Sequence, residues 1–288
     1  MDYMKRRDFL IMSGMSAAAA VAGARTRASE APRLRTIAYN VYGCQGFPRK
    51  KENAQRLNLA APQMPTRLAM ELALYEPDII TCSEAPAEPA VAAAARQLDM
   101  DYVYFESLSG SGYPGALLTH YPIVEAANCP LKQGQKRPED LLTRHFGRAL
   151  LETPSGKVAV FSAHLNPHKT ELRQREADLI IEVMGKDVGA GRPVLLQGDL
   201  NHLPSAPEYD KWRGAAWVDA YAAKNTDGMG TVSSGHPGRR IDYIWIHGAL
   251  VARLIECRVL YEGAFRHNRD DRAAFALSDH LPIMATFA

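Results

Sequence analysis

Short apolar runs alternate with longer amphipathic stretches through most of the 288-residue chain. The apolar runs predict strands, and apolar residues at helical spacing predict helices. Strands are expected at 34–43, 78–85, 101–107, 116–119, 147–153, 157–167, 193–196 and 239–248 and at the end of 276–288. Helices are expected within 50–74, 89–98 and 169–185, and the polar, basic stretch 131–146 predicts a long surface loop. This length suits one large core, and the pattern indicates no second one.

The first residues follow a different pattern. An arginine pair at 6–7 precedes an alanine-rich apolar run that ends at Ala24, which is typical of a twin-arginine export signal. Only about fifteen residues are apolar, fewer than the ~20 that span a bilayer, so stable membrane insertion is not expected. Cleavage after Ala24 or Ala28 fits, and retention as a tether stays open. We predict a signal at 1–28, carried by the Tat translocase, and a periplasmic or secreted domain at 29–288.

Charge and cysteine content narrow the possible partners. The net charge is +2, and removing residues 1–28 leaves 29 basic against 30 acidic residues, about −1, while cleavage after Ala24 leaves about +1. A protein that grips long duplex DNA usually has a basic face, which this balance does not support, although a local patch is compatible with it. The four cysteines show no CxxC or Cys/His spacing, which argues against structural zinc. Cys82 lies in an apolar segment and is expected to be a buried free thiol.

The stretch Leu195–Pro204, LLQGDLNHLP, is the first candidate for chemistry. The apolar run breaks at Gln197-Gly198 and is followed by Asp199 and Asn201, which predicts a buried strand that ends in a loop carrying a carboxylate and a carboxamide. Glycine permits a tight turn and a close ligand. An Asx-turn that ends a core strand is the plain alternative, because Asp and Asn are ordinary turn residues.

Recurrence of this arrangement favours a functional site. Polar side chains stand at or near one end of an apolar strand at Asn40, Glu84, His164, Asp199, Asn201, Asp242, Asp279 and His280. Together they would meet at one sheet edge. Glu84 follows an apolar run directly, and a carboxylate there needs a partner, a hydrogen bond or a metal. Oxygen ligands without a cysteine or histidine cluster favour Mg²⁺, with Mn²⁺ or Ca²⁺ as alternatives, over zinc.

The order of the motifs resembles the endonuclease/exonuclease/phosphatase family. The resemblance rests on YNVYG, SEA, GALLTHYPI, GRALLE, SAHLNP, GDLN, IDYIWI and SDHLPI and covers residues 34–288. It implies an α/β fold, a four-layer α/β sandwich in which two packed, mostly antiparallel sheets are flanked by helices, with the site at one rim. Two positions depart from the family pattern: Ser83 stands where many members have Gln, and Asn166 replaces an acidic residue.

The resemblance also implies roles for the site residues. Glu84 would be the main metal ligand. Asn40 would belong to the metal site as well, where it would orient Glu84 and touch phosphate, and Asp279 would be an outer or second metal contact. Asp199 would activate or orient the attacking water. Asn201 would hold this water and the phosphoryl group. His280, oriented by Asp242, would donate to a phosphoryl oxygen, and His164 would do the same from the other side. Arg148 would contact a substrate phosphate, with a surface salt bridge as the alternative.

These expectations describe an exported metal-dependent phosphoesterase that hydrolyses phosphodiester or phosphomonoester bonds by in-line attack of water. The substrate would be a nucleic acid, a lipid head group or a small phosphodiester, and the basic loop 132–148 would suit a short nucleic acid or a phosphorylated head group. The absence of a hydrophobic hairpin weakens a sphingomyelinase interpretation. A secreted endonuclease acting on DNA or RNA, and a non-catalytic binding scaffold with the same fold, are the alternatives. A monomer is expected.

Overall fold

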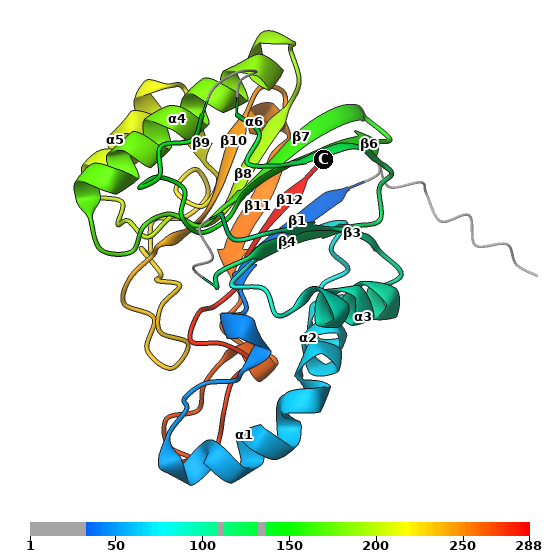
Figure 1. Cartoon of the computed structure of the whole chain (residues 1–288), viewed down its shortest axis with the longest axis vertical. Coiled ribbons are helices and arrows are strands. Elements are labelled where there is room, and N and C mark those ends of the chain that lie inside the picture. The colour runs from blue at the N-terminus through cyan, green and yellow to red at the C-terminus, as the bar shows by residue number, and fades with distance from the viewer. Residues whose placement is uncertain (1–32, 109–111, 132–135) are drawn as a thin grey trace, which may run out of the picture. The chain divides into compact units, whose positions relative to one another are not determined.

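Two packed six-stranded sheets form the centre of the domain, and helices cover their outer faces (Figure 1). The computed structural model describes residues 33–108, 112–131 and 136–288, so the predicted export signal at 1–28 lies outside the described residues. The first sheet has the strand order β11-β12-β1-β2-β4-β3 and the second has β5-β6-β7-β8-β10-β9. Each sheet has one parallel pair, β1 with β2 and β7 with β8, and its other pairs are antiparallel. The predicted four-layer α/β sandwich is confirmed.

The helices and strands follow one another along the chain in this order. The strands are β1 Leu34–Asn40, β2 Ile79–Ser83, β3 Asp101–Phe105, β4 Gly115–Thr119, β5 Ile123–Asn128, β6 Phe146–Thr153, β7 Gly156–Ala163, β8 Val194–Asp199, β9 Val218–Asp219, β10 Asp242–His247, β11 Leu254–Val259 and β12 Ile283–Phe287. The α-helices are α1 Ala54–Ala60, α2 Met64–Ala73, α3 Glu88–Leu98, α4 Thr170–Gly189, α5 Pro207–Gly214 and α6 Leu250–Arg253.

The strands of the second sheet are apolar on both faces because each face is covered. In β8, Leu195 belongs to the core between the sheets, whereas Val194 and Leu196 belong to the core beneath α4 and α5. In β10, Ile244 likewise belongs to the core between the sheets, and Tyr243 belongs to the core beneath α4 and α5. Side chains alternate across a strand, so a strand covered on both faces has a continuous apolar run instead of a two-residue alternation.

Helix α4 covers the outer face of the second sheet (Figure 1). Its buried residues Ala177, Ile180 and Met184 recur at three- and four-residue intervals, which places them on the stripe that packs against the strands. The helix joins β7 to the parallel strand β8, as the sequence predicts for a strand, helix, strand unit. In the part of the chain that the structure describes, none of the helices has both the length and the apolar character needed to cross a membrane.

The strand pattern was predicted well and the long helical region less well. The stretch expected to be helical at 50–74 contains α1 and α2, separated by short 3₁₀ segments at Lys51–Asn53 and Ala61–Gln63. The strands β5, β9 and β11 and the helix α5 were not predicted. From residue 136 to Phe146, where β6 begins, the predicted loop has no helix or strand.

Candidate active site

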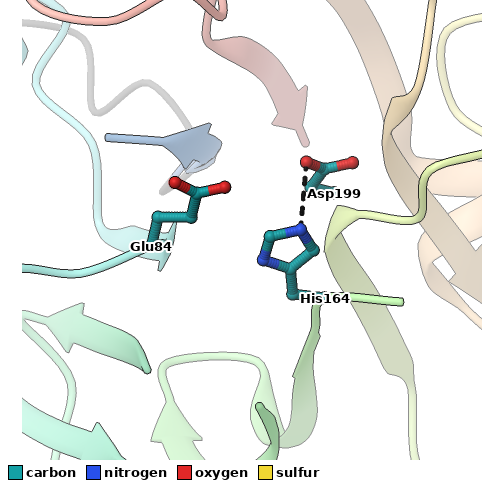
Figure 2. Close-up of side chains that lie close together, drawn as sticks. All are labelled: Glu84, His164 and Asp199. Atoms are coloured by element: carbon teal, nitrogen blue, oxygen red, sulfur yellow. Dashed lines mark ion pairs between the residues drawn. The ribbon is translucent and has the colours of Figure 1, made fainter. Parts of the chain in front are cut away.

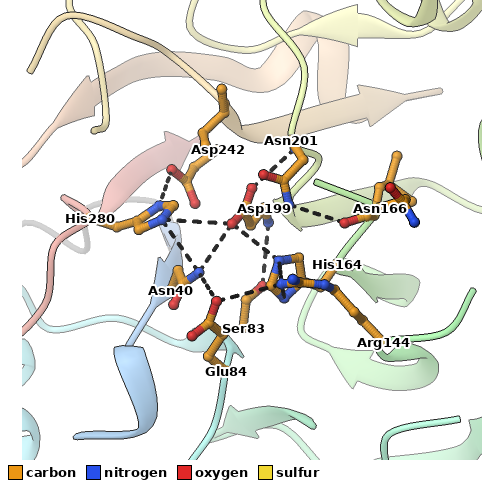
Figure 3. A network of polar contacts seen from close by, with 12 residues as sticks. Asn40, Ser83, Glu84, Arg144, His164, Asn166, Asp199, Asn201, Asp242 and His280 are labelled. Atoms are coloured by element: carbon orange, nitrogen blue, oxygen red, sulfur yellow. Dashed lines mark hydrogen bonds and ion pairs between the residues drawn. The ribbon is translucent and has the colours of Figure 1, made fainter. Parts of the chain in front are cut away.

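Polar residues from both sheets meet at one end of the sandwich, as Figure 3 shows. They lie at these places: Asn40 ends β1, Glu84 follows β2, His164 follows β7, Asp199 ends β8, Asp242 begins β10, and Asp279 and His280 precede β12. The antiparallel pairing of β8 and β10 sets Asp199 opposite Asp242. Strand ends that are distant in sequence therefore share one rim.

Asp199 is at the centre of this group. Its Oδ2 accepts a hydrogen bond from Asn40 Nδ2 at 3.1 Å and lies 3.3 Å from His164 Nε2 and 3.7 Å from His280 Nε2. Burial and then the negative charge of Asp242 raise the pKa of Asp199 to about 7, although His280 and the hydrogen bond from Asn40 offset part of this rise. A carboxylate in this setting can hold or take a proton near neutral pH.

His280 is paired with a buried carboxylate. Its Nδ1 lies 2.8 Å from Asp242 Oδ2, and both side chains are buried. Burial alone would lower the pKa of His280, but Asp242 and then Asp199 raise it to about 10. The ring is thus held as an imidazolium, with Nε2–H facing the Asp199 carboxylate.

The turn after β8 needs glycine at Gly198. Its φ is +139°, and a Cβ there would lie 2.1 Å from the carbonyl oxygen of Ala163. Three residues after Gly198, Asn201 has a φ of +53°, its N–H donates to Asp199 Oδ1 at 3.1 Å, and its Nδ2 donates to the carbonyl of Leu165. The Asp199 carboxylate thus accepts the N–H of an Asx-turn, and this turn fixes its orientation. The Asx-turn and the site assignment are therefore compatible.

Glu84, His164 and Asp199 can offer ligand atoms within 4.8 Å of one another (Figure 2). Asp199, Asp242 and His280 can do so as well. Glu84 Oε1 accepts from Asn40 Nδ2 at 3.2 Å, so one carboxamide is shared between the two carboxylates Glu84 and Asp199. Glu84 has a φ of +50°, an uncommon conformation for this residue type that the surrounding structure must stabilise.

This set of donors fits a hard divalent cation. Burial raises the pKa of both Glu84 and Asp199, which shows that their negative charge is poorly compensated. Asp242 Oδ1 is also buried and has no hydrogen-bond partner among the described residues. A bound cation would neutralise this charge, and Mg²⁺, Mn²⁺ and Ca²⁺ accept carboxylate ligands. Asn40, the predicted metal contact, donates from Nδ2 to the carboxylates of Glu84 and Asp199 and accepts the N–H of Tyr42 at Oδ1, so its amide orients both carboxylates.

Asp279 and Arg148 differ in how they relate to the site. Asp279 lies beside His280 and adds negative charge that raises the pKa of His280 and of Glu84, but it belongs to neither possible ligand group. Arg148 is not brought to the site. Its guanidinium donates to Asp187 through Nε at 2.8 Å and Nη2 at 2.7 Å, and Nη1 donates to Glu125 at 3.0 Å.

The reason is the two-residue period of β6. Arg148 shares its face with Phe146 and Leu150, which pack in the core beneath α4, whereas Ala149 and Leu151 face the other sheet. Arg148 therefore forms a buried ion pair with Asp187 of α4, in place of both the predicted contact with a substrate phosphate and the alternative of a surface salt bridge.

Arg144, which the sequence analysis did not single out, takes a place at the site. Its Nη1 lies 2.6 Å from His164 Nε2 and 3.6 Å from Glu84 Oε1, and its guanidinium stacks over the ring of Tyr113 at 3.9 Å. Burial, and then Arg144, hold the pKa of His164 well below its usual value, so this ring is neutral. The only signal for Arg144 in the sequence was the basic character of its loop.

The two departures from the family pattern have local roles (Figure 3). Ser83 Oγ accepts the backbone N–H of Asp199 at 3.3 Å, which ties β2 to β8 across the two sheets. Asn166 Oδ1 accepts the N–H groups of His168 and Lys169 immediately before α4. Neither departure from the family pattern therefore removes a central group from the site.

Comparisons with known proteins show the family and the fold of the chain. Residues 37–280 match the family model described as Endonuclease/Exonuclease/phosphatase family. Among solved structures, a family protein from Bacteroides thetaiotaomicron has a TM-score of 0.68 and 19% identity over 88% of this chain and 94% of its own. A mannosyl-6-phosphatase from Bacteroides thetaiotaomicron VPI-5482 has a TM-score of 0.67 and 18% identity over 88% and 98%. Truncated TDP2 from Caenorhabditis elegans has a TM-score of 0.62 and 17% sequence identity, and the match covers 88% of this chain and 97% of TDP2. No curated protein matches the sequence.

Proposed function

The chain belongs to the endonuclease/exonuclease/phosphatase family, and we propose that it is an exported, metal-dependent phosphoesterase that hydrolyses phosphodiester or phosphomonoester bonds. The observation that carries this proposal is the position of Asp199, buried between His164, His280 and Asn40 and within ligand distance of Glu84. A phosphoryl group that enters here meets one ionisable carboxylate and donors on both sides.

In this proposal Glu84 holds the divalent cation, together with an oxygen of Asp199 or Asp279. The cation, when bound, would neutralise negative charge on the phosphoryl oxygens. Asn40 fixes the positions of the Glu84 and Asp199 carboxylates relative to each other because its Nδ2 donates to both. Mg²⁺ is the expected ion, with Mn²⁺ or Ca²⁺ as alternatives.

The proton transfer is assigned to Asp199. Its carboxylate would orient the attacking water and accept its proton, and Asn201, whose N–H is bonded to Asp199 Oδ1, would fix the other side of that water. His280, kept protonated by Asp242, would donate to a phosphoryl oxygen. His164 and Arg144 would stabilise the same group from the opposite side, so Arg144 takes the role first given to Arg148.

The decisive test is hydrolysis by the protein lacking residues 1–28. Plasmid DNA, bis-p-nitrophenyl phosphate, p-nitrophenyl phosphate and sphingomyelin form the panel, each with Mg²⁺, with Mn²⁺ and with EDTA. The panel includes a phosphomonoester because one of the similar structures is a mannosyl-6-phosphatase. We expect metal-dependent hydrolysis of at least one ester and its loss in His280→Ala. Metal-dependent nicking of DNA would specify a secreted endonuclease, and binding without hydrolysis of any ester would favour the scaffold alternative.

Export through the twin-arginine pathway is the second part of the proposal. It is supported by the arginine pair at 6–7 and the alanine-rich run that follows. The full chain with Arg6→Lys and Arg7→Lys should remain in the cytoplasm, whereas the wild-type chain should be found in the periplasm or medium. Export of the variant at wild-type level would contradict this part while leaving the assignment of the site intact.

A further inference from the structure

A cleft of about 350 Å³ adjoins the candidate active site. It lies among the segment after β1, the loop before β10 and the loop before β12, and the lining residues used here are Phe47, Lys50, Ser233, His236, His267 and Arg269. Backbone bonds fix these segments to one another: Phe47 and Ala276 exchange two hydrogen bonds, and His267 N–H donates to the carbonyl of Ser234.

The cleft is connected to the site through its backbone and through a row of rings. Val232, next to the lining residue Ser233, pairs with His280, and Ser234 N–H donates to the carbonyl of Asp279 at 2.8 Å. Tyr42, two residues after Asn40, contacts the Phe47 ring edge-on at 6.4 Å, and Phe47 contacts His267 at 6.0 Å. A ligand with one group at His280 can therefore extend into the cleft.

Positive charge collects in this cleft without an acidic partner. Lys50 and Arg269 are exposed, and neither forms an ion pair with any other residue that the structure describes. The pKa of the buried His267 is lowered by burial and by the nearby charges of Lys50 and Arg269, so both cations act on the same ring. An adjoining hollow of about 380 Å³ shares His267 and Arg269 and adds Arg266, with Asp270 as a carboxylate at its wall.

Converging cations of this kind repel one another unless an anion lies between them. Lysine and arginine are the usual side chains for phosphate, and the positive edge of an aromatic ring such as Phe47 tolerates an anion nearby. The nearly balanced net charge is a sum over the whole chain, so it is compatible with a local excess of positive charge in this cleft.

We propose that the cleft binds a second phosphate group of the substrate, so that the natural substrate carries at least one phosphate besides the one that is hydrolysed. This inference rests on the proposed function and specifies its substrate class. The second phosphate would belong either to a neighbouring nucleotide or to a bisphosphorylated small molecule. Lys50 and Arg269 would contact it directly, with His236 at the rim of the cleft.

Two substrate pairs test the proposal in the protein lacking residues 1–28. One pair is the thymidine dinucleotide with and without a 5′-phosphate, and the other is glucose 1,6-bisphosphate and glucose 6-phosphate. The ratio of kcat/KM within each pair is compared among wild type, the double variant Lys50→Ala/Arg269→Ala and the control Lys157→Ala. Lys157 is an exposed cation near the beginning of β7, at the opposite end of that strand from His164.

We expect at least one pair to favour the doubly phosphorylated member in wild type and in the control, and the double variant to lower that ratio about tenfold or more. The pair that responds identifies the source of the second phosphate. Ratios that are the same in all three proteins, with hydrolysis intact, would overturn the inference and leave the proposed function standing.

A binding measurement decides the inference even if none of these esters is hydrolysed. Fluorescence anisotropy of a labelled oligothymidylate in EDTA gives the dependence of log K on log salt. Because each neutralised phosphate contributes a slope of about 0.7 for single strands, loss of the two cations that hold this one phosphate should reduce the magnitude of the slope by about 0.7. An unchanged slope, together with an unchanged inhibition constant of glucose 1,6-bisphosphate against bis-p-nitrophenyl phosphate, would also overturn the inference.

Discussion

Asp242 Oδ2 lies 2.8 Å from His280 Nδ1, and this buried contact joins the first residue of β10 in one sheet to the segment before β12 in the other. The carboxylate fixes the ring orientation and keeps the imidazole protonated, since Asp242 and Asp199 raise its pKa to about 10 against the effect of burial. The pair thus connects the packing of the two sheets with the charge of the site.

The first prediction concerns pH. If activity needs the imidazolium of His280, activity is lost as pH rises through the raised pKa of this ring. Asp242→Asn removes the neighbouring negative charge, so the pKa falls and the alkaline limb of the kcat/KM profile should move to lower pH. The limb is measured on the best ester from the panel between pH 6 and 11, a range that contains both the ordinary histidine pKa of about 6.5 and the raised pKa of His280, about 10. An alkaline limb at the same pH in Asp242→Asn and wild type would contradict this role.

Arg144 and Arg148 give a matched pair of variants. Arg144→Ala should lower kcat/KM about 10- to 100-fold, the loss expected for one hydrogen bond to a charged group, with little change in stability. Arg148→Met should retain activity but lower the free energy of unfolding by about 3 kcal/mol, because it leaves the buried Asp187 with Arg192 as its remaining cation. Urea unfolding and steady-state kinetics measure both effects, and the reverse assignment would show that Arg148 serves the substrate.

Gly198 tests the loop that carries Asp199. Gly198→Ala should destabilise the protein by about 3 kcal/mol. Its φ of +139° is strained for alanine, and the carbonyl of Ala163 leaves no room for a methyl group. Gly156→Ala is the control, because its φ is also positive, at +103°, but nothing lies within 4 Å of the added Cβ. Equal losses in the two variants would assign the effect to backbone conformation alone.

Metal binding can be measured without turnover. At a concentration 100 times its Kd, a ligand that binds only the native state stabilises it by about 2.7 kcal/mol. Mg²⁺ should therefore raise the Tm of wild type, and Glu84→Gln should greatly reduce this rise. Glu152→Gln, a half-exposed carboxylate near the hairpin between β6 and β7, should keep it. If Glu84→Gln showed the full Mg²⁺ response, Glu84 would not be the principal ligand.

The sequence predicted the strand-end residues because the places where apolar runs stop are visible in it. Asn40, Glu84, His164 and Asp199 each stand where a run ends, and the fold brings those ends together. The orientation of a side chain within a strand is harder to predict when both faces are buried, because the pattern then has no polar face. This is the reason that Arg148 was assigned to the wrong environment.

Arg144 was missed for a different reason. Its loop lacks periodicity, and its partners Tyr113, His164 and Glu84 come from three other segments, so tertiary structure alone defines its position. The strands β5 and β11 were missed because they pair at or near the sheet edges and contain several exposed residues, which weakens the apolar signal.

The central claim is that the Asp199 carboxylate takes part in metal-dependent ester hydrolysis. The direct measurement is kcat/KM of Asp199→Asn with saturating Mg²⁺ on the best ester of the panel, together with its circular dichroism spectrum and Tm. The account predicts a native fold and a loss of about 10²-fold or more, because a positioned acid or base contributes this much. A folded Asp199→Asn protein that keeps near-wild-type, EDTA-sensitive activity would contradict the account.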